Sequence, residues 1–265
     1  MKLGIVGAME IEVADLISSL TESKRQVLAG MTFYEGKLAG VETVIVRSGV
    51  GKVNAAVCTQ ILIDRFGVEE ILNTGVAGSL DAQINIGDFV ISTDVVHHDV
   101  DACVFGYEPG QVPQMPVVSF PADETPAGLP LQTCREVNPD IGVWRGRIAS
   151  GDQFIADPAV KKRISDTFHA SCAEMEGAAI AQTAWLNRVP FVILRAISDK
   201  ADGSDQMDYP VFEEQAAHHS ARLTLELIRR LNANSLSVHC GNPSPVEQKY
   251  IRIRQEQESR SRRQG

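Results

Sequence analysis

The chain has little of what marks nucleic-acid-binding or membrane proteins. Its 25 Lys and Arg residues are outnumbered by 34 Asp and Glu residues, and the formal net charge is -9. A general nucleic-acid-binding surface needs an excess of basic residues to contact phosphates, so this class is disfavoured. No run approaches the roughly 18 apolar residues of a membrane-spanning helix. We therefore expect neither nucleic acid nor a membrane as a partner.

Cysteine is scarce, and its spacing argues against a metal site or a disulfide framework. No two cysteines have the close spacing of a zinc site, and their number is odd. The five are Cys58, Cys103, Cys134, Cys172 and Cys240. The adjacent His97 and His98 would face opposite sides of a strand, so we do not expect them to share a metal. Scattered thiols suit a reducing compartment, and the N-terminus predicts a strand and not a signal peptide, so we expect a cytoplasmic protein.

What the chain does contain is an alternation of short apolar runs and helical patterns. Strands are predicted at residues 2–6, 43–47, 71–73, 88–96, 147–150 and 191–196. Helices are predicted at residues 11–20, 52–66, 177–186 and 212–231. Strands that alternate with helices predict a three-layer α/β/α fold with a central, twisted, mostly parallel mixed sheet. With 44% hydrophobic residues, the chain can bury a sizeable core between these layers.

The composition changes once, close to residue 232. We predict a single domain over residues 1–231, followed by a polar, basic tail over residues 232–265. The tail has few apolar residues to offset the entropy of ordering, so it is expected to be disordered or marginally helical. Within the domain, the prolines of residues 109–130 exclude a long helix. Apolar residues beside these prolines predict a loop that is covered by its own domain or by a partner subunit.

The most informative segment is an apolar run that carries charged residues at its end. Residues 192–199 read V-I-L-R-A-I-S-D, with Arg195 inside the run and Asp199 at its end. Such a run is typical of a parallel strand that is covered on both faces. Ligands of open α/β sheets bind beyond the carboxyl ends of the strands. There Asp199, in apolar surroundings, can transfer a proton, and Arg195 can hold an anionic group.

Two acidic residues follow the glycines of the first predicted strand. The segment lacks the G-x-G-x-x-G spacing of a dinucleotide site, and Glu10 and Glu12 would repel a phosphate at the helix start. One interpretation is that both carboxylates stabilise the helix dipole. The other is that a carboxylate at this strand end acts as a general base toward water. The residues alone leave both interpretations open.

Three further motifs each have a functional and a structural interpretation. Residues 73–79 predict a glycine-rich turn, which either lets backbone N–H groups approach a ligand or is a plain tight turn. Phe154 and Ile155 either line a pocket for an aromatic base or belong to the core. Glu176, just before a predicted helix, either accepts two hydrogen bonds from a sugar diol or favours the helix start.

Taken in order along the chain, these motifs resemble one family. The chain is similar to the 5′-methylthioadenosine/S-adenosylhomocysteine nucleosidases, within the purine nucleoside phosphorylase superfamily, over residues 1–231. The resemblance rests on residues 4–12, 48–56, 73–78, 105–107 with 110–113, 150–155, 174–181 and 195–199. It implies a nucleoside phosphorylase-like fold and hydrolysis of 5′-methylthioadenosine, S-adenosylhomocysteine and 5′-deoxyadenosine to adenine and the 5-substituted ribose, in methionine salvage. It implies no cofactor and no metal.

The resemblance also implies roles for individual residues. Glu12 would be the general base that activates water, Asp199 the general acid toward N7 of adenine, and Glu176 the residue that holds the ribose hydroxyls. The other implied substrate-binding residues are Ala8, Met9, Val50, Gly78, Phe154, Ile155, Met175, Arg195, Ser198 and Tyr209. The residues implied to close the 5′-substituent pocket of the neighbouring subunit in a homodimer are Phe105, Tyr107 and Pro113.

The sequence departs from the family in ways that leave alternatives. Val76 stands where relatives usually carry a Ser that can orient the catalytic aspartate, and Tyr209 where they usually carry a Phe. Phosphorolysis is disfavoured, because phosphorylases of this superfamily carry an Arg and a Ser where this chain has Asn73 and Val76. A nucleosidase for another 5′-substituted adenosine, such as 6-amino-6-deoxyfutalosine, stays open. A catalytically silent nucleoside-binding protein should lack the acid or the base, and both Glu12 and Asp199 are present.

Overall fold

A computed structural model describes residues 1–123, 141–200 and 209–238, without the side chains of residues 209–213, 231 and 233–238. Residues Met1–Arg229 form one compact unit and Arg230–Gly265 a second. The last helix, α6 (Tyr209–Val238), extends past the predicted domain end at residue 231. Residues 239–265 lie outside the described part, so the nature of the tail stays a prediction.

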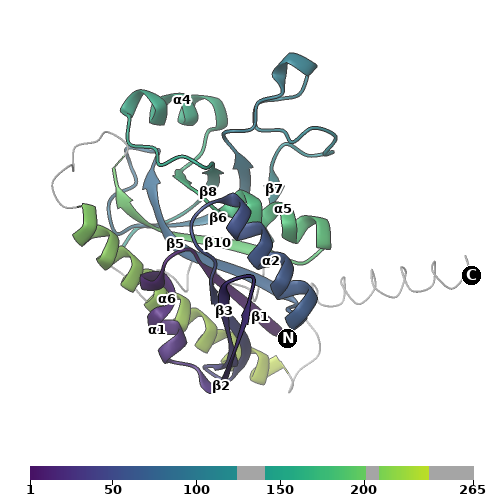
Figure 1. The fold of residues 1–265 in the computed structure, drawn as a ribbon. Helices are drawn as coiled ribbons and strands as arrows, with labels where there is room; N and C mark the ends of the chain where they lie inside the picture. The colour runs from purple at the N-terminus through teal and green to yellow at the C-terminus, as the bar shows by residue number, and fades with distance from the viewer. Residues whose placement is uncertain (124–140, 201–208, 239–265) are drawn as a thin grey trace, which may run out of the picture. The chain divides into compact units, whose positions relative to one another are not determined.

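The first unit contains a mixed sheet (Figure 1). Its strands are β1 (Lys2–Gly7), β2 (Thr21–Leu28), β3 (Met31–Leu38), β4 (Val41–Arg47), β5 (Glu70–Ser79), β6 (Phe89–His97), β7 (Phe120–Pro121), β8 (Val143–Ser150), β9 (Cys172–Glu174) and β10 (Phe191–Asp199). Strands β4, β1, β5 and β10 are neighbours and run parallel. The antiparallel strands β2 and β3 extend the sheet beyond β4. On the other side, β10 also pairs with β6, and β6, β8 and β9 lead back to β5.

Helices cover both faces of this sheet, which confirms the predicted three-layer α/β architecture. They are α1 (Glu10–Ser18), α2 (Lys52–Phe66), α4 (Pro158–Phe168), α5 (Gly177–Asn187), α6, and the 3-10 turn η1 (Cys103–Phe105). Helix α2 ends where the sequence predicts, because Gly67 adopts the left-handed conformation with φ 62°. Helix α4 starts at Pro158, behind the Asp157 carboxylate, which accepts hydrogen bonds from Ala159 N and Val160 N. None of the described helices is both long and apolar enough to span a bilayer.

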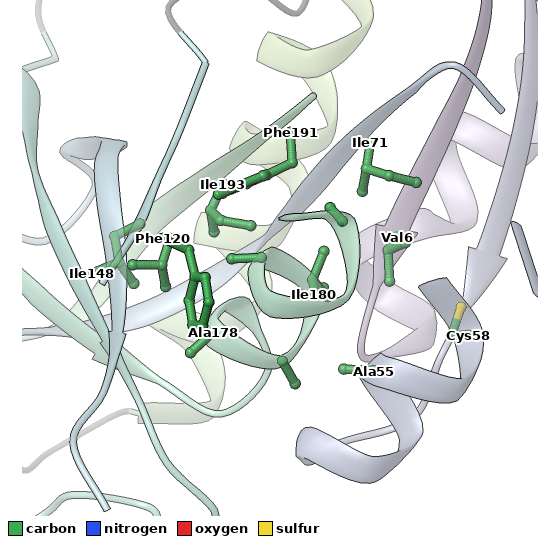
Figure 2. Close-up of a cluster of buried hydrophobic side chains, with 14 of the residues drawn as sticks. Val6, Ala55, Cys58, Ile71, Phe120, Ile148, Ala178, Ile180, Phe191 and Ile193 are labelled. Carbon is green, nitrogen blue, oxygen red and sulfur yellow. The ribbon is translucent and has the colours of Figure 1, made fainter. Parts of the chain in front are cut away.

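The main core lies between the sheet and helices α2 and α5. In Figure 2, Ala178 and Ile180 of α5 lie among side chains of the strands, with Ala55 and Cys58 of α2 beside them. The Ala-rich sequence of α5 lets this helix pack closely against α2 and the sheet. The close packing holds the parallel strands rigidly, and their carboxyl ends carry the residues described below.

One prediction about an element was wrong, and other elements were not predicted. Residues 73–79 are not a turn but the second half of β5, which runs parallel to β10 as far as Gly78 and pairs antiparallel with β9 at Gly78 and Ser79. The glycines concealed the strand, because they lower its apolar content and are usual in turns. The hairpin of β2 and β3 was not predicted, because β2 has the polar sequence TESKRQVL and is exposed nearly throughout. A strand without a buried face has no apolar alternation to detect.

Candidate active site

The candidate site lies at the carboxyl ends of β1, β5 and β10. These strands are adjacent and parallel, so segments far apart in the sequence end at the same edge of the sheet. Gly7 ends β1 directly before Glu12 of α1, and Asp199 ends β10 opposite Gly78 of β5. A register shift between Ile197 and Asp199 marks this end of β10. Such irregularities re-aim side chains and are frequent beside active sites.

Glu12 is a buried carboxylate held by the main chain. Only 1% of the residue is exposed. Its Oε2 accepts hydrogen bonds from Ala8 N at 2.7 Å and Met9 N at 2.9 Å, and its Oε1 accepts one from Val76 N at 3.1 Å. Burial raises the pKa of Glu12 above its usual value, although Arg195 and these three N–H groups favour the ionised form. A carboxylate with a raised pKa is a stronger base than an exposed one.

Arg195 is completely buried and binds side chains from two other segments. Its Nη2 donates to Asn73 Oδ1 at 2.5 Å and to Glu174 Oε2. Glu176 Oε2 lies 3.6 Å from the same nitrogen. Burial opposes the charge of Arg195, but Glu174, Glu176 and Glu12 together raise its pKa above the usual value. Arg195 Nη2 is therefore engaged by protein groups, and this nitrogen positions carboxylates of the protein itself.

Glu174 was not predicted as a site residue, yet it connects the parts of the site. It accepts hydrogen bonds from Ser150 Oγ, from Glu176 N at 3.1 Å, and from Gly177 N at 2.9 and 2.8 Å. The last two contacts hold the first turn of α5, where an acidic group stabilises exposed N–H groups. The spacing E-x-E-G over residues 174–177 contained a signal for it, because both carboxylates precede a helix.

Among Glu12, Glu174 and Glu176, the Glu176 carboxylate accepts the fewest hydrogen bonds. Its Oε1 accepts a hydrogen bond from Gly51 N at 2.9 Å, and 4% of the residue is exposed. Burial and the neighbouring Glu174 raise the pKa of Glu176 to about 7, against the opposing effect of Arg195. Glu12, Glu174 and Glu176 thus share one guanidinium. Three carboxyl groups around one guanidinium suit a ligand that becomes positive during reaction.

The glycines of β5 make room for these charged side chains. A Cβ at Gly75 would lie 2.2 Å from Arg195 Nη1 and 2.5 Å from Glu12 Oε1. A Cβ at Gly78 would lie 2.8 Å from Asp199 Oδ1. The groups that lie close to these glycines are side chains of the protein itself, so the predicted approach of a ligand to this backbone stays a prediction. Only glycine at both positions leaves these side chains space.

Asp199 lies in surroundings that differ from those expected. The sequence predicts an apolar strand end, but the Lys161 ammonium of α4 donates a hydrogen bond to Asp199 Oδ2. Lys161 was missed, because it lies in an unpredicted helix far away in sequence. The Ser198 hydroxyl is 3.4 Å from Asp199 Oδ1, too long for a strong hydrogen bond. The Asp199 side chain keeps 23% of its surface exposed, so a ligand can reach it.

Two hollows flank the charged cluster. The first borders Asp199 and is lined by Gly78, Leu80, Gln153, Phe154, Ile155, Lys161, Ala173, Glu174 and Met175. The second borders the backbone that holds Glu12 and is lined by Ala8, Met9, Glu10, Ile17, Gly30, Met31, Thr32, Tyr34, Arg47, Ser48, Gly49 and Val50. Phe154 is mostly exposed on the first hollow and not part of the core, which favours the pocket interpretation. A flat, partly apolar space beside an acid suits an aromatic base.

The remaining predicted residues have mixed outcomes. Phe105 is 80% exposed on η1, Pro113 is exposed, and the hydroxyl of Tyr107 accepts a hydrogen bond from Gln114 N at 3.2 Å. These three residues line neither hollow of their own chain. Tyr209 begins α6, and its side chain lies outside the described part. Val76 contacts Glu12 through its backbone N–H, a contact that does not depend on its side chain.

The chain is similar to known proteins over most of its length. The family model described as "Phosphorylase superfamily" matches residues 2–229. A 5′-methylthioadenosine/S-adenosylhomocysteine nucleosidase from Geobacillus sp. (strain WCH70) is 45% identical over 232 residues, which cover 87% of this chain and 99% of the relative. A nucleosidase of the same name from Shewanella loihica is 43% identical, with coverages of 87% and 100%.

Solved structures of a nucleosidase and of a futalosine hydrolase are also similar to this chain. A methylthioadenosine/S-adenosylhomocysteine nucleosidase from Colwellia psychrerythraea, in complex with adenine, is 41% identical with a TM-score of 0.82, and the match covers 87% of this chain and 96% of that one. The futalosine hydrolase of Helicobacter pylori is 32% identical with a TM-score of 0.78, and its coverages are 87% and 98%.

Proposed function

The chain belongs to the 5′-methylthioadenosine/S-adenosylhomocysteine nucleosidases of the phosphorylase superfamily, and from this premise we propose that it hydrolyses the N-glycosidic bond of these two nucleosides and of 5′-deoxyadenosine. The products are adenine and the 5-substituted ribose. The observation that supports this most is a buried carboxylate, Glu12, beside Gly75 of β5 and a reachable one, Asp199, beside Gly78 of the same strand.

The proposed chemistry assigns one task to each carboxylate. Asp199 donates a proton to N7 of adenine, which lets the base leave as a neutral purine. Positive charge then develops on the ribose, and the carboxyl groups of Glu12, Glu174 and Glu176 stabilise it. Glu12 removes a proton from water as the water attacks C1′. Glu176, with one oxygen engaged by Gly51 N, holds the ribose hydroxyls with its other oxygen.

The backbone hydrogen bonds that Glu12 accepts favour hydrolysis over phosphorolysis. A phosphate at this strand end would need the backbone N–H groups of Ala8, Met9 and Val76, and the Glu12 carboxylate already occupies all three. A second anion beside this carboxylate would be repelled. Water carries no charge and meets neither obstacle.

The test is adenine release from 5′-methylthioadenosine, with and without added phosphate, by the wild type and by Asp199→Asn. We expect release that does not depend on phosphate and that falls by about 10²–10⁴-fold in the variant, the usual contribution of a general acid or base. Release that requires phosphate would assign the protein to the phosphorylases. If the wild type released adenine only from a 6-amino-6-deoxyfutalosine-type nucleoside, the proposed 5′ substituent would be wrong, and the proposed hydrolysis of the N-glycosidic bond would stand.

Homodimer formation, cytoplasmic location and a place in methionine salvage belong to the same proposal. The exposed Phe105 and its exposed neighbour Val104 on η1 support a partner surface, because large apolar side chains seldom project together into water. Their task would be to close the second hollow of the other subunit. Light scattering of the wild type and of Phe105→Ser tests this part. A wild type that stays monomeric at assay concentration would contradict it.

A further inference from the structure

Lys161 is a buried cation to which the family chemistry above gives no task. Only 4% of this residue is exposed, and its ammonium donates to Asp199 Oδ2 and to the Lys200 carbonyl at 2.7 Å. Its neighbour Lys162 projects into solvent and pairs with Asp166 at 2.8 Å. Burying an ammonium is costly unless a partner compensates it. The contact with Asp199 is therefore a specific feature of this site.

We propose that Lys161 positions Asp199 and is the immediate source of the proton that Asp199 delivers, an inference that rests on the proposed function. One proton moves from the Lys161 ammonium to the Asp199 carboxylate as that carboxylate protonates N7. The C1′–N9 bond breaks, and its electron pair stays with adenine. Water adds to C1′ and gives its proton to Glu12. The enzyme then regains its starting state when one proton returns from solvent to Lys161 and one leaves Glu12.

The surroundings of the pair support a relay. Among the described residues that line the first hollow, Lys161 is the only cation. Glu174 lines the same hollow, Cys172 faces the pair from β9, and Arg195 is engaged by Glu174. Among the described lining residues, Lys161 is therefore the cation in direct contact with Asp199. A lysine can give up its proton, whereas an arginine in the same place would keep it.

The experiment compares adenine release from 5′-methylthioadenosine between pH 5 and pH 9 for four proteins: wild type, Lys161→Met, Lys161→Arg and the matched control Lys162→Met. For Lys161→Met we expect activity near that of the wild type at pH 5, where protons from solvent are abundant enough to replace the one from Lys161. At pH 8 we expect a kcat lower by about tenfold or more, a fraction of the general-acid contribution. Lys161→Arg should keep KM but lose kcat in the same way, and Lys162→Met should match the wild type throughout.

Two results would overturn this proposal. A loss of activity by Lys161→Met that is equal at every pH would assign Lys161 a structural role only. A Lys161→Arg variant with full kcat at pH 8 would show that Lys161 does not supply the proton. Thermal unfolding of each variant shows whether it is folded. A wild type that releases no adenine at any pH would contradict the proposed function itself, so the two failures are distinguishable.

A different observation concerns the second hollow, which contains a pair of opposite charges. Arg47 ends β4 and Glu10 begins α1, and Arg47 Nη1 lies 3.5 Å from Glu10 Oε2. Both side chains are exposed and line the hollow together with Ala8 and Met9. With adenine beside Asp199 and the ribose at Glu176, the 5′ carbon of a substrate is directed toward this hollow. Its two charges therefore lie where the end of a long 5′ substituent would reach.

From this placement we infer that Arg47 and Glu10 bind the amino-acid end of S-adenosylhomocysteine, an inference that also rests on the proposed function. A guanidinium matches a carboxylate through parallel hydrogen bonds, so Arg47 fits the α-carboxylate. Glu10 fits the α-ammonium group. The methyl end of 5′-methylthioadenosine has no charge and gains nothing from the pair, so Arg47 and Glu10 select between the two substrates.

Steady-state kinetics with both substrates test the second inference. We expect Arg47→Met to lower kcat/KM for S-adenosylhomocysteine by about tenfold, mainly through KM, since a partly exposed charge pair contributes modestly. Glu10→Gln should lower it less. Neither should change turnover of 5′-methylthioadenosine, which also shows that the variants fold. Arg25→Met, an exposed arginine of β2 outside the hollow, is the matched control. An equal change for both substrates, or none, would overturn the inference.

Discussion

The two carboxylates that flank the site are held in opposite ways. Glu12 is fully buried and receives three backbone N–H groups, so its position depends on how β1, α1 and β5 meet. Asp199 is partly exposed and is held mainly by one side chain, Lys161. A group held by the main chain cannot be adjusted by substituting a neighbour, whereas one held by a side chain can. The half of the site with the proposed base, Glu12, is therefore rigid, and the half with the proposed acid, Asp199, can be tuned.

Substituting Glu12, in the rigid half of the site, should have the largest effect on adenine release. In Glu12→Gln, the amide nitrogen must face either Val76 N–H or the pair Ala8 N–H and Met9 N–H, which places donor against donor. We expect adenine release to fall by about 10²–10⁴-fold, because the base is lost. Single-turnover assays and thermal unfolding would measure the two consequences separately. Retained activity would move the base to another residue.

The glycines of β5 allow each half to be disturbed alone. Gly75→Ala would place a methyl group against Arg195 and Glu12, which cannot move because both are buried. Gly78→Ala would press on Asp199, which can shift toward solvent. Overpacking costs about 1–3 kcal/mol, so we expect Gly75→Ala to lose about 100-fold in activity together with stability. Gly78→Ala should lose about tenfold at nearly unchanged stability. Equal losses of stability in urea titrations would contradict the distinction.

At low pH, the rate of adenine release should depend on the ionisation of Glu12. Glu12 must be ionised to accept a proton, and burial raises its pKa above that of an exposed glutamate. The rate should therefore fall as the pH drops through this raised pKa, by about tenfold per pH unit below it. Profiles of kcat/KM measure this limb. A limb at the pKa of an ordinary glutamate would mean that the N–H groups outweigh burial.

The smallest effect concerns stability and not activity. The pKa of Glu176 is raised to about 7 in the folded protein, so the folded state binds this proton more tightly than the unfolded state does. Glu176 therefore lowers stability progressively as the pH rises from the unfolded pKa through 7. Glu176→Gln should raise the melting temperature relative to wild type by about 2–4 °C at pH 8, the shift expected for 1 kcal/mol, and by less at pH 5. A difference that is independent of pH would contradict this.

The elements that the sequence revealed share a physical property. Strands β1, β4, β6 and β10 and helices α1, α2 and α5 bury many apolar residues, and these elements were predicted close to their true bounds. Strands β5 and β8 were predicted only in part, over residues 71–73 and 147–150. The hairpin of β2 and β3 and helix α4 were missed. Strand β2 has almost no buried face, and α4 combines few apolar residues with several charged ones. Periodicity is informative only where burial imposes it.

The sequence by itself determined the α/β class, the main apolar strands and helices, and the candidate acid and base, because apolar runs and a set of motifs in one order are local properties of the chain. Only the tertiary structure decided the partners of those residues. Glu12 meets Val76, Arg195 meets Glu174, and Asp199 meets Lys161 across long sequence separations. These contacts form because parallel strands bring their carboxyl ends to one edge of a sheet. A local sequence pattern does not predict which side chains lie together at that edge.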